Sequence, residues 1–208
     1  MSASLESTLP KMGLELDVAQ LAQLEKYAQL LRKWNKTYNL VSTPDLHQLE
    51  GRHLLDSLAI LPFLNGTRVL DIGTGAGLPG IPLAIAAPDK HFVLLDSNGK
   101  KTRFLFQVKL ALGLDNITIE NCRIEHYQSQ QQIDIVTCRA FATIPEILRL
   151  TEPLFHPETV LLAMKGRYPE DELASLPDRS RLLASHKLEI PGQDSERHLL
   201  AITFPPDQ

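Results

Sequence analysis

The chain has 208 residues, with 21 Lys and Arg against 25 Asp and Glu and a formal net charge of −4 at pH 7. Hydrophobic residues make up 43% and charged residues 22%, a balance that supports a buried core and excludes disordered and collagen-like chains. The negative charge also argues against a general nucleic-acid binder, because such proteins usually carry a basic surplus.

No apolar run approaches the roughly 18 residues that span a bilayer. The first residues lack the basic region and the apolar region of a signal peptide, so we expect a cytoplasmic protein with no membrane partner. The two cysteines, Cys122 and Cys138, make neither a disulfide framework nor a zinc site. We therefore expect a reducing compartment and no metal.

Residues 14–64 follow a helical period. Asp17 can cap a helix whose apolar side chains recur at helical spacing. Thr43-Pro44 predicts a cap followed by proline at the start of a second helix, which runs to Pro62 and contains Gly51. We expect an N-terminal helical extension over residues 1–64, packed onto the sheet through Trp34 and Tyr38.

From residue 65 onward, short β-rich runs alternate with helical stretches. This order predicts βαβ units and a mostly parallel, Rossmann-like sheet covered on both faces. The last two runs have no helix between them and predict an antiparallel hairpin, an arrangement seen in methyltransferases that use S-adenosylmethionine. We expect residues 65–208 to form that domain, in one compact unit with the extension. The predicted strands are 68–72, 92–95, 117–120, 133–138, 159–164, 186–190 and 198–204.

A strand, a glycine loop and a helix start follow one another at residues 69–82. Glycines let the backbone turn sharply and approach a ligand, and a helix N-terminus offers unpaired N–H groups. Gly75, Gly77 and Gly80 fit the spacing of a dinucleotide-binding loop, which leaves NAD as one hypothesis.

A second count starts at the acidic residue Asp71 and continues through Gly73, Gly75 and Gly77. This count fits the end of the strand better. An acid there also suits a ligand with a cationic end, such as the methionine portion of S-adenosylmethionine, whereas it would repel a pyrophosphate. We therefore favour S-adenosylmethionine over NAD.

Two further strand ends are suited to an adenosine. Asp96 ends the second predicted strand, where a carboxylate can accept hydrogen bonds from both ribose hydroxyls in either kind of site. After the third strand, backbone groups at Ile124 and the Glu125 side chain could hold the adenine edge.

With these residues in place, the chain closely resembles the glucose-inhibited division protein B family, the bacterial small-subunit rRNA guanine-N7 methyltransferases. The most specific features are the Leu78-Pro79-Gly80-Ile81-Pro82 extension of the glycine loop and the R-H-x-L-D-S segment at 52–57. The resemblance implies methyl transfer from S-adenosylmethionine to N7 of one guanine in 16S rRNA, near the decoding region. Further shared segments are Trp34-Asn35-Lys36, Asn39-Leu40, Leu95-Asp96-Ser97, Gly99-Lys100-Lys101, Arg103-Phe104-Leu105, Arg139-Ala140, Lys165-Gly166 and Glu196-Arg197-His198.

Carried over by position, the family's cofactor contacts fall on Gly73, Leu78, the Ile124-Glu125 pair and Arg139, with Asp96 at the ribose. Ile124 stands where the family usually has Ala, and a larger side chain there could crowd the adenine. Cys138 replaces a Ser that is common before the arginine.

The implied chemistry makes few demands on the protein. Guanine N7 carries a free lone pair, so the enzyme works by alignment and needs no general base. Methylation at pyrimidine C5 would need a cysteine nucleophile, and we interpret Cys138 instead as a small buried apolar residue. The segment 137–141 also lacks the Asn/Asp-Pro-Pro-aromatic turn that marks amino-group methylation of adenine.

Three cations follow or flank predicted strands. We expect Arg139, Lys165 and Arg197 to converge on the ligand-binding edge of the sheet, face the RNA and position the substrate. A second basic cluster contains Lys100, Lys101, Arg103 and Lys109. A local patch of this kind is compatible with the net negative charge and predicts weak affinity for arbitrary RNA.

The expected partner is 16S rRNA in the small subunit or in an assembly intermediate, and the expected state is a monomer. The alternatives are an NAD-dependent oxidoreductase, a non-catalytic RNA or ribosome-assembly factor with the same fold, and a small-molecule methyltransferase.

Overall fold

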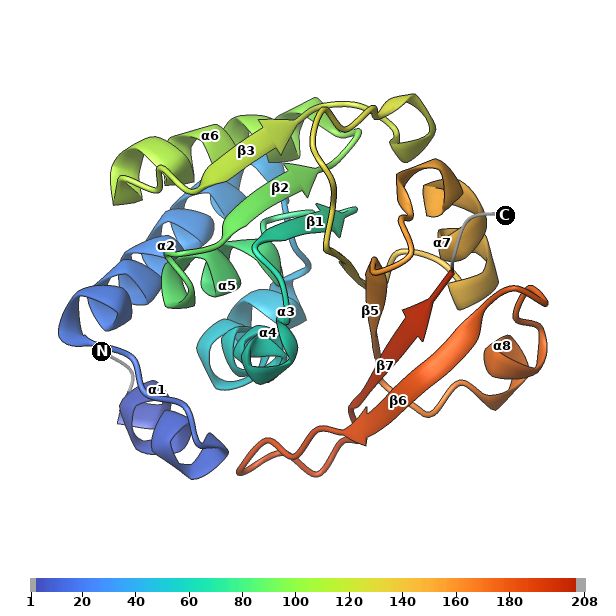
Figure 1. Ribbon diagram of the computed structural model, residues 1–208. Helices are drawn as coiled ribbons and strands as arrows, with labels where there is room; N and C mark the ends of the chain where they lie inside the picture. The colour runs from blue at the N-terminus through green and yellow to red at the C-terminus, as the bar shows by residue number, and fades with distance from the viewer. Residues whose placement is uncertain (1–2, 205–208) are drawn as a thin grey trace.

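A computed structural model describes residues 3–204 of the chain. Within that range seven strands form one sheet in the order β3-β2-β1-β4-β5-β7-β6, and helices lie against both faces (Figure 1). The predicted Rossmann-like α/β class is confirmed. The strands are β1 (Arg68–Ile72), β2 (His91–Leu95), β3 (Ile117–Glu120), β4 (Ile135–Arg139), β5 (Val160–Lys165), β6 (Arg181–Lys187) and β7 (His198–Thr203).

The first five strands are parallel; β7 pairs antiparallel with β5, and β6 pairs antiparallel with β7 at the edge of the sheet. β1 pairs with β2 on one side and with β4 on the other, so the strand order reverses between β1 and β4. Ligands of open parallel sheets bind at the carboxyl ends of the strands beside such a reversal. The residues that follow β1 and β4 therefore occupy the expected site.

The C-terminal hairpin is confirmed, but its first strand was predicted in the wrong place. β6 begins at Arg181 and ends at Lys187, whereas the sequence predicted 186–190. Most side chains of this edge strand are exposed, so 181–185 lacks the alternation of a half-buried strand. Leu188 and Ile190 are buried because they pack into the core beyond the end of the strand.

The predicted first helix of the extension is α2 (Val18–Tyr38), and the Asp17 cap is confirmed. The Asp17 carboxylate accepts the Gln20 N–H at 2.8 Å, and the Gln20 amide oxygen accepts the Asp17 N–H at 2.9 Å. This reciprocal pair satisfies two N–H groups that a helix start leaves open. The other helices before β1 are α1 (Ala3–Thr8), η1 (Leu9–Met12), α3 (Thr43–His47), η2 (Leu49–Leu54), α4 (Leu55–Leu58) and η3 (Leu61–Phe63).

The predicted second helix is broken into short pieces. Its cap is Ser42 and not Thr43, because the Ser42 hydroxyl accepts the Asp45 N–H. A wide π-helical turn, η2, then separates α3 from α4, and Gly51 lies inside it. Turns of this kind often occur at functional sites because they change the direction of the side chains that follow.

The two faces of the sheet carry separate cores. One core packs β-strand side chains against α2, α4, α5 (Gly80–Ala86) and α6 (Gly99–Leu112). The other packs them against α7 (Ile144–Thr151), which lies on the opposite side in Figure 1. The remaining short helices are η4 (Ile124–His126), η5 (Glu152–Leu154) and α8 (Glu170–Ala174).

Aromatic packing joins the extension to helix α6, whereas the sequence predicted that Trp34 and Tyr38 would pack on the sheet. The ring of Trp34 stacks on Tyr38 at 5.1 Å between centroids and meets Phe104 of α6 at 5.8 Å. The buried hydroxyl of Tyr27 donates to the Ala76 carbonyl in the glycine loop at 2.8 Å. The extension is thus tied directly to the loop that follows β1. No helix in the described part of the chain is long and apolar enough to cross a bilayer.

Candidate active site

The glycine loop after β1 has a backbone that suits glycine. Gly73, Gly75 and Gly77 all have positive φ angles, of 63°, 63° and 96°. A Cβ at Gly77 would lie 2.4 Å from Ile81 Cγ1 and 2.9 Å from a Leu105 methyl. The loop therefore packs closely on α5 and α6 at Gly77, and a side chain there would disrupt both the φ angle and that packing.

Asp71, at the end of β1, lies under this loop and is fully buried. One carboxylate oxygen, Oδ2, accepts the Thr74 hydroxyl at 2.6 Å and the Gly80 N–H at 2.9 Å. The expected contact of Asp71 with a cationic ligand therefore needs correction, because the side chain has no exposed surface. Asp71 ties the start of the loop to the start of α5.

Burial raises the pKa of the Asp71 carboxyl to about 7. The hydrogen bonds from Thr74 and Gly80 lower this pKa, but the effect of burial is larger. The folded protein then binds a proton that the unfolded chain releases near pH 4, so the stability that Asp71 contributes falls as the pH rises through about 7. Asp71→Asn removes this dependence. From pH 4 to pH 8, the unfolding free energy of the variant minus that of the wild type should rise by roughly 2–4 kcal/mol. Urea titrations at each pH measure the unfolding free energies. A difference between variant and wild type that stays constant from pH 4 to pH 8 would contradict the prediction.

The Asp96 carboxylate holds the other side of the glycine loop. Its Oδ2 accepts the Gly75 N–H at 2.9 Å, and its Oδ1 accepts the Asn98 N–H at 2.8 Å. The Lys101 ammonium lies 3.8 Å from Oδ2. Each carboxylate oxygen keeps acceptor capacity for a ligand hydroxyl.

A cavity of about 440 Å³ opens beside Asp96 and is called the glycine-loop pocket below. Four predicted cofactor residues line it: Gly73, Asp96, Ile124 and Glu125. Gly75 is one hydrogen bond away, through Asp96. The structure thus brings together the predicted ribose and adenine residues. Asp71 and Gly77 face the protein interior, and Leu78 and Arg139 line a different cavity.

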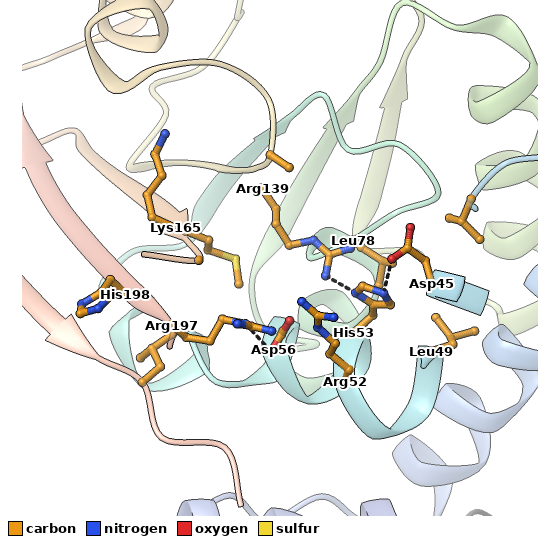
Figure 2. A pocket seen from close by; sticks show the side chains of 15 residues that line it. Asp45, Leu49, Arg52, His53, Asp56, Leu78, Arg139, Lys165, Arg197 and His198 are labelled. Atoms are coloured by element: carbon orange, nitrogen blue, oxygen red, sulfur yellow. Dashed lines mark hydrogen bonds and ion pairs between the residues drawn. The ribbon is translucent and has the colours of Figure 1, made fainter. Parts of the chain in front are cut away.

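That second cavity, of about 380 Å³, is called the arginine pocket (Figure 2). The three predicted cations Arg139, Lys165 and Arg197 all line it, so their convergence at the sheet edge is confirmed. Ala140, directly after β4, lines both pockets. The end of β4 therefore separates two adjoining cavities, one beside the glycine loop and one beside the extension.

Each of the three cations has a partner within the chain. Arg139 Nη1 lies 3.1 Å from His53 Nδ1, and Arg197 Nε donates to Asp56 Oδ1 at 3.1 Å. The Lys165 ammonium behaves differently from the expectation, because Figure 2 shows it pointing away from the two arginines. It bonds both carboxylate oxygens of Glu172 in α8, at 2.7 and 2.9 Å. Its charge is therefore largely neutralised, and it links β5 to α8.

The extension supplies a wall of the arginine pocket that the sequence interpretation missed. Asp45, Arg52, His53 and Asp56 come from α3, η2 and α4 and face the arginines across the cavity (Figure 2). Arg52, His53 and Asp56 belong to the R-H-x-L-D-S segment, to which no chemical role was given, and no sequence signal pointed to Asp45. Within the described residues, the buried Arg52 Nε and Arg197 Nη2 have no hydrogen-bond partner. A ligand rich in acceptors would satisfy these donors.

Only three of the four residues in the predicted second basic cluster lie together. Lys100, Lys101 and Arg103 lie at the start of α6, but Lys109 lies near its end and donates to the Ile117 carbonyl at 2.6 Å. Lys109 therefore belongs to the packing of α6 on β3. The remaining group lies beside the glycine-loop pocket, since Lys101 lines that pocket.

Cys138, in β4, is buried with 2% of its surface exposed. Burial raises the pKa of its thiol to about 12, so the thiolate that a nucleophile requires is suppressed. Its interpretation as a packed apolar residue is confirmed.

Comparison with known proteins gives a consistent result. The GidB family model, described as rRNA small subunit methyltransferase G, matches residues 20–200. The chain is 48% identical over 198 residues to ribosomal RNA small subunit methyltransferase G of Hahella chejuensis, covering 95% of this chain and 91% of that one. It is 47% identical over 193 residues to the protein of that name from Marinomonas sp., covering 93% of each chain.

Solved structures show the same architecture at low identity. TYW2 of M. jannaschii, in complex with AdoMet, matches with a TM-score of 0.58 and 14% identity, covering 75% of this chain and 77% of that one. A likeness at this identity establishes the fold alone.

Proposed function

Because the chain belongs to the rRNA small subunit methyltransferase G family, we propose that it methylates N7 of a single guanine in 16S rRNA, near the decoding region. It is a methyltransferase, and its cofactor is S-adenosylmethionine. The observation that carries the site assignment is the adjacency of the glycine-loop and arginine pockets, which share Ala140. One pocket suits the cofactor and the other suits the base.

The donors and acceptors of the glycine-loop pocket fit the cofactor. Asp96 offers acceptors for the ribose hydroxyls, and Ile124 and Glu125 line the same pocket, which supports their proposed role at the adenine edge. At Gly73 a Cβ would lie 2.3 Å from a Phe141 ring carbon, so only glycine leaves that wall open. When bound, the cofactor supplies a methyl group activated by a sulfonium. The chain has to hold that group toward the arginine pocket.

The arginine pocket suits a purine with acceptor atoms. Leu78 and Met164 provide apolar wall, and Arg139 and Arg197 provide guanidinium donors. N7 is the attacking atom, and a donor bonded to it would block transfer. The arginines therefore bind O6 or a phosphate and leave the N7 lone pair free. Because no proton leaves N7 before attack, alignment of base and methyl is the main contribution of these residues.

A variant of Cys138 separates this chemistry from attack through a cysteine. Cys138→Ala is expected to keep methyl transfer within about threefold of wild type, because no covalent intermediate is formed. The small cavity should lower the unfolding free energy by roughly 1 kcal/mol. Initial rates with subunits lacking the modification and a urea titration measure the two effects. Loss of transfer with the fold intact would instead indicate a nucleophilic cysteine.

The proposed reaction is tested by incorporation of labelled methyl groups into three substrates: small subunits lacking the modification, the naked 16S rRNA and large subunits. We expect incorporation into small-subunit RNA and a lower rate on naked RNA, because the pocket cations are already paired within the chain. Calorimetry with S-adenosylhomocysteine and with NAD tests the cofactor separately. Cofactor binding without any methylated product would support a non-catalytic assembly factor and contradict the proposal.

The proposal extends to the organisation of the protein. We assign residues 1–64 and 65–208 to one working unit, in which the helical extension completes the base pocket; residues 1–2 and 205–208 lie outside the described range. We further propose that it acts as a monomer in the cytoplasm, on the small subunit or an assembly intermediate. Sedimentation with and without subunits tests the monomer assignment.

A further inference from the structure

The R-H-x-L-D-S segment at 52–57 supplies one arginine of the arginine pocket, Arg52, and touches the other two, Arg139 and Arg197. His53, at the end of the π-helical turn, contacts Arg139 at 3.1 Å. Three residues later, Asp56 accepts from Arg197 at 3.1 Å. The Asp56 and Arg197 side chains are 6% and 11% exposed, so their pair is held out of water. One helical segment therefore meets two guanidinium groups that come from separate strand ends.

The hydrogen bonds around His53 define its protonation. A guanidinium donates and never accepts, so His53 Nδ1 must accept from Arg139 Nη1. The other ring nitrogen, Nε2, lies 3.1 Å from Asp45 Oδ1 and must carry the proton that is donated to that carboxylate. The ring is thus neutral and bonded on both sides. Asp45, His53 and Arg139 form a chain of hydrogen bonds that begins in α3 and ends at β4 (Figure 2).

These hydrogen bonds restrain the guanidinium of Arg139, the group proposed to contact the base. A long side chain at a strand end has several open rotamers, and a single well-placed acceptor selects one of them. The bond uses one of the five guanidinium N–H groups and leaves the others free to bind substrate.

We propose that His53 is a positioning residue for methyl transfer: bonded to Asp45, it accepts a hydrogen bond from Arg139 and holds that guanidinium toward the base. This inference rests on the proposed function and adds to it a residue of the extension that sets the reactive geometry.

Protonation of His53 would break this arrangement. The ring would lose its acceptor and place a second positive charge beside Arg139. Burial and Arg139 lower the pKa of His53, whereas the carboxylates of Asp45 and Asp56 raise it, and the net direction is downward. Arg52, the preceding residue, also lines the pocket and adds positive charge. The neutral form therefore dominates at neutral pH, and the transfer rate should fall as the pH drops through this lowered value.

Two substitutions of His53 separate the accepting nitrogen from the donating one. The amide oxygen of His53→Asn can take the place of Nδ1 and accept from Arg139. The longer side chain of His53→Gln mimics Nε2 and loses that acceptor. We expect His53→Asn to keep kcat on small subunits within about threefold of wild type and His53→Gln to lower it by about tenfold or more. A role in packing alone would make the two variants equally impaired, and equal values would overturn the proposal.

Controls separate this outcome from misfolding. His91 is a partly exposed histidine at the start of β2 with its own hydrogen bond to Thr118, so His91→Asn should keep wild-type kcat. Thermal midpoints and the affinity for S-adenosylhomocysteine should be alike in both His53 variants. In an Arg139→Ala background the two variants should become equal, because no guanidinium remains to be held. A persistent difference in that background would contradict the inference.

The pH profile gives an independent measurement. The fall in kcat at acidic pH that protonation of His53 causes should be absent in His53→Asn. The titration of Asp71 contributes equally to the profiles of wild type and of this variant. Identical acid limbs in wild type and His53→Asn would overturn the inference. If wild-type protein transfers no methyl group, the proposed function fails, and binding of the small subunit then tests the inference alone. Binding should weaken in His53→Gln and not in His53→Asn, and equal binding would overturn it.

Discussion

Replacing Arg139 by alanine is expected to lower kcat/KM for methyl transfer to the small subunit by about 10²–10³-fold. Arg139 lines the arginine pocket, and Ala140, which follows it, lines both pockets. We propose that the residue orients the base, and misplacement of a reacting atom by about 1 Å can cost a hundredfold in rate. Initial rates at several subunit concentrations measure the loss.

The matched control for this prediction is Arg149→Ala, which removes an exposed arginine from the last turn of α7. The control should keep wild-type kcat/KM. Arg139→Ala should also keep its far-UV circular dichroism and an affinity for S-adenosylhomocysteine within roughly tenfold of wild type, because Arg139 lines the arginine pocket and not the glycine-loop pocket. Full turnover by Arg139→Ala would show that the site is assigned wrongly.

Asp96→Ala is expected to weaken binding of S-adenosylhomocysteine by about a hundredfold or more. The carboxylate has two functions that alanine loses together. It accepts the N–H groups of Gly75 and Asn98, which shapes the glycine loop. In the proposed site it also presents acceptors to the ribose. Calorimetry at fixed pH measures the change in dissociation constant.

Asp115→Ala is the matched control, since it removes an exposed carboxylate from the turn after α6. It should bind S-adenosylhomocysteine like wild type. Asp96→Asn is informative as well, because its amide oxygen keeps one acceptor and should restore part of the affinity. Wild-type affinity in Asp96→Ala would mean that the cofactor lies elsewhere.

The half of the site nearest the glycine loop was predictable from sequence because it depends on strand ends. In a parallel sheet the carboxyl ends of neighbouring strands meet at one edge, so residues that follow predicted strands converge whatever the loops do. Asp96 and Ile124 were located on this basis, and so was Arg139 of the adjoining arginine pocket. The orientation of the Asp71 side chain could not be predicted in this way. Asp71 also lies at a strand end, but its carboxylate points inward and bonds Thr74 and Gly80.

The other half was not predictable in this way because its contacts join distant residues. Arg197 meets Asp56 across 141 positions, and Arg139 meets His53 across 86. No local period encodes such pairs. The π-helical turn that carries His53 breaks the helical period on which the prediction of a continuous second helix relied.

The net charge of −4 also acquires a structural explanation. Two of the pocket cations are paired with acids of the same chain, Arg197 with Asp56 and Lys165 with Glu172. The protein therefore presents donors in a shaped cavity and not a broad basic surface. Such a site favours a target of defined shape over arbitrary RNA, whose binding depends on many phosphate contacts.

The most direct measurement maps 7-methylguanosine in 16S rRNA from cells with and without this protein, and from subunits treated with the purified protein and S-adenosylmethionine. The account predicts one guanine near the decoding region that carries the N7 methyl group only when the active protein is present, and that stays unmodified with Arg139→Ala. An identical modification pattern with and without the protein, or a methyl group on another atom, would contradict it.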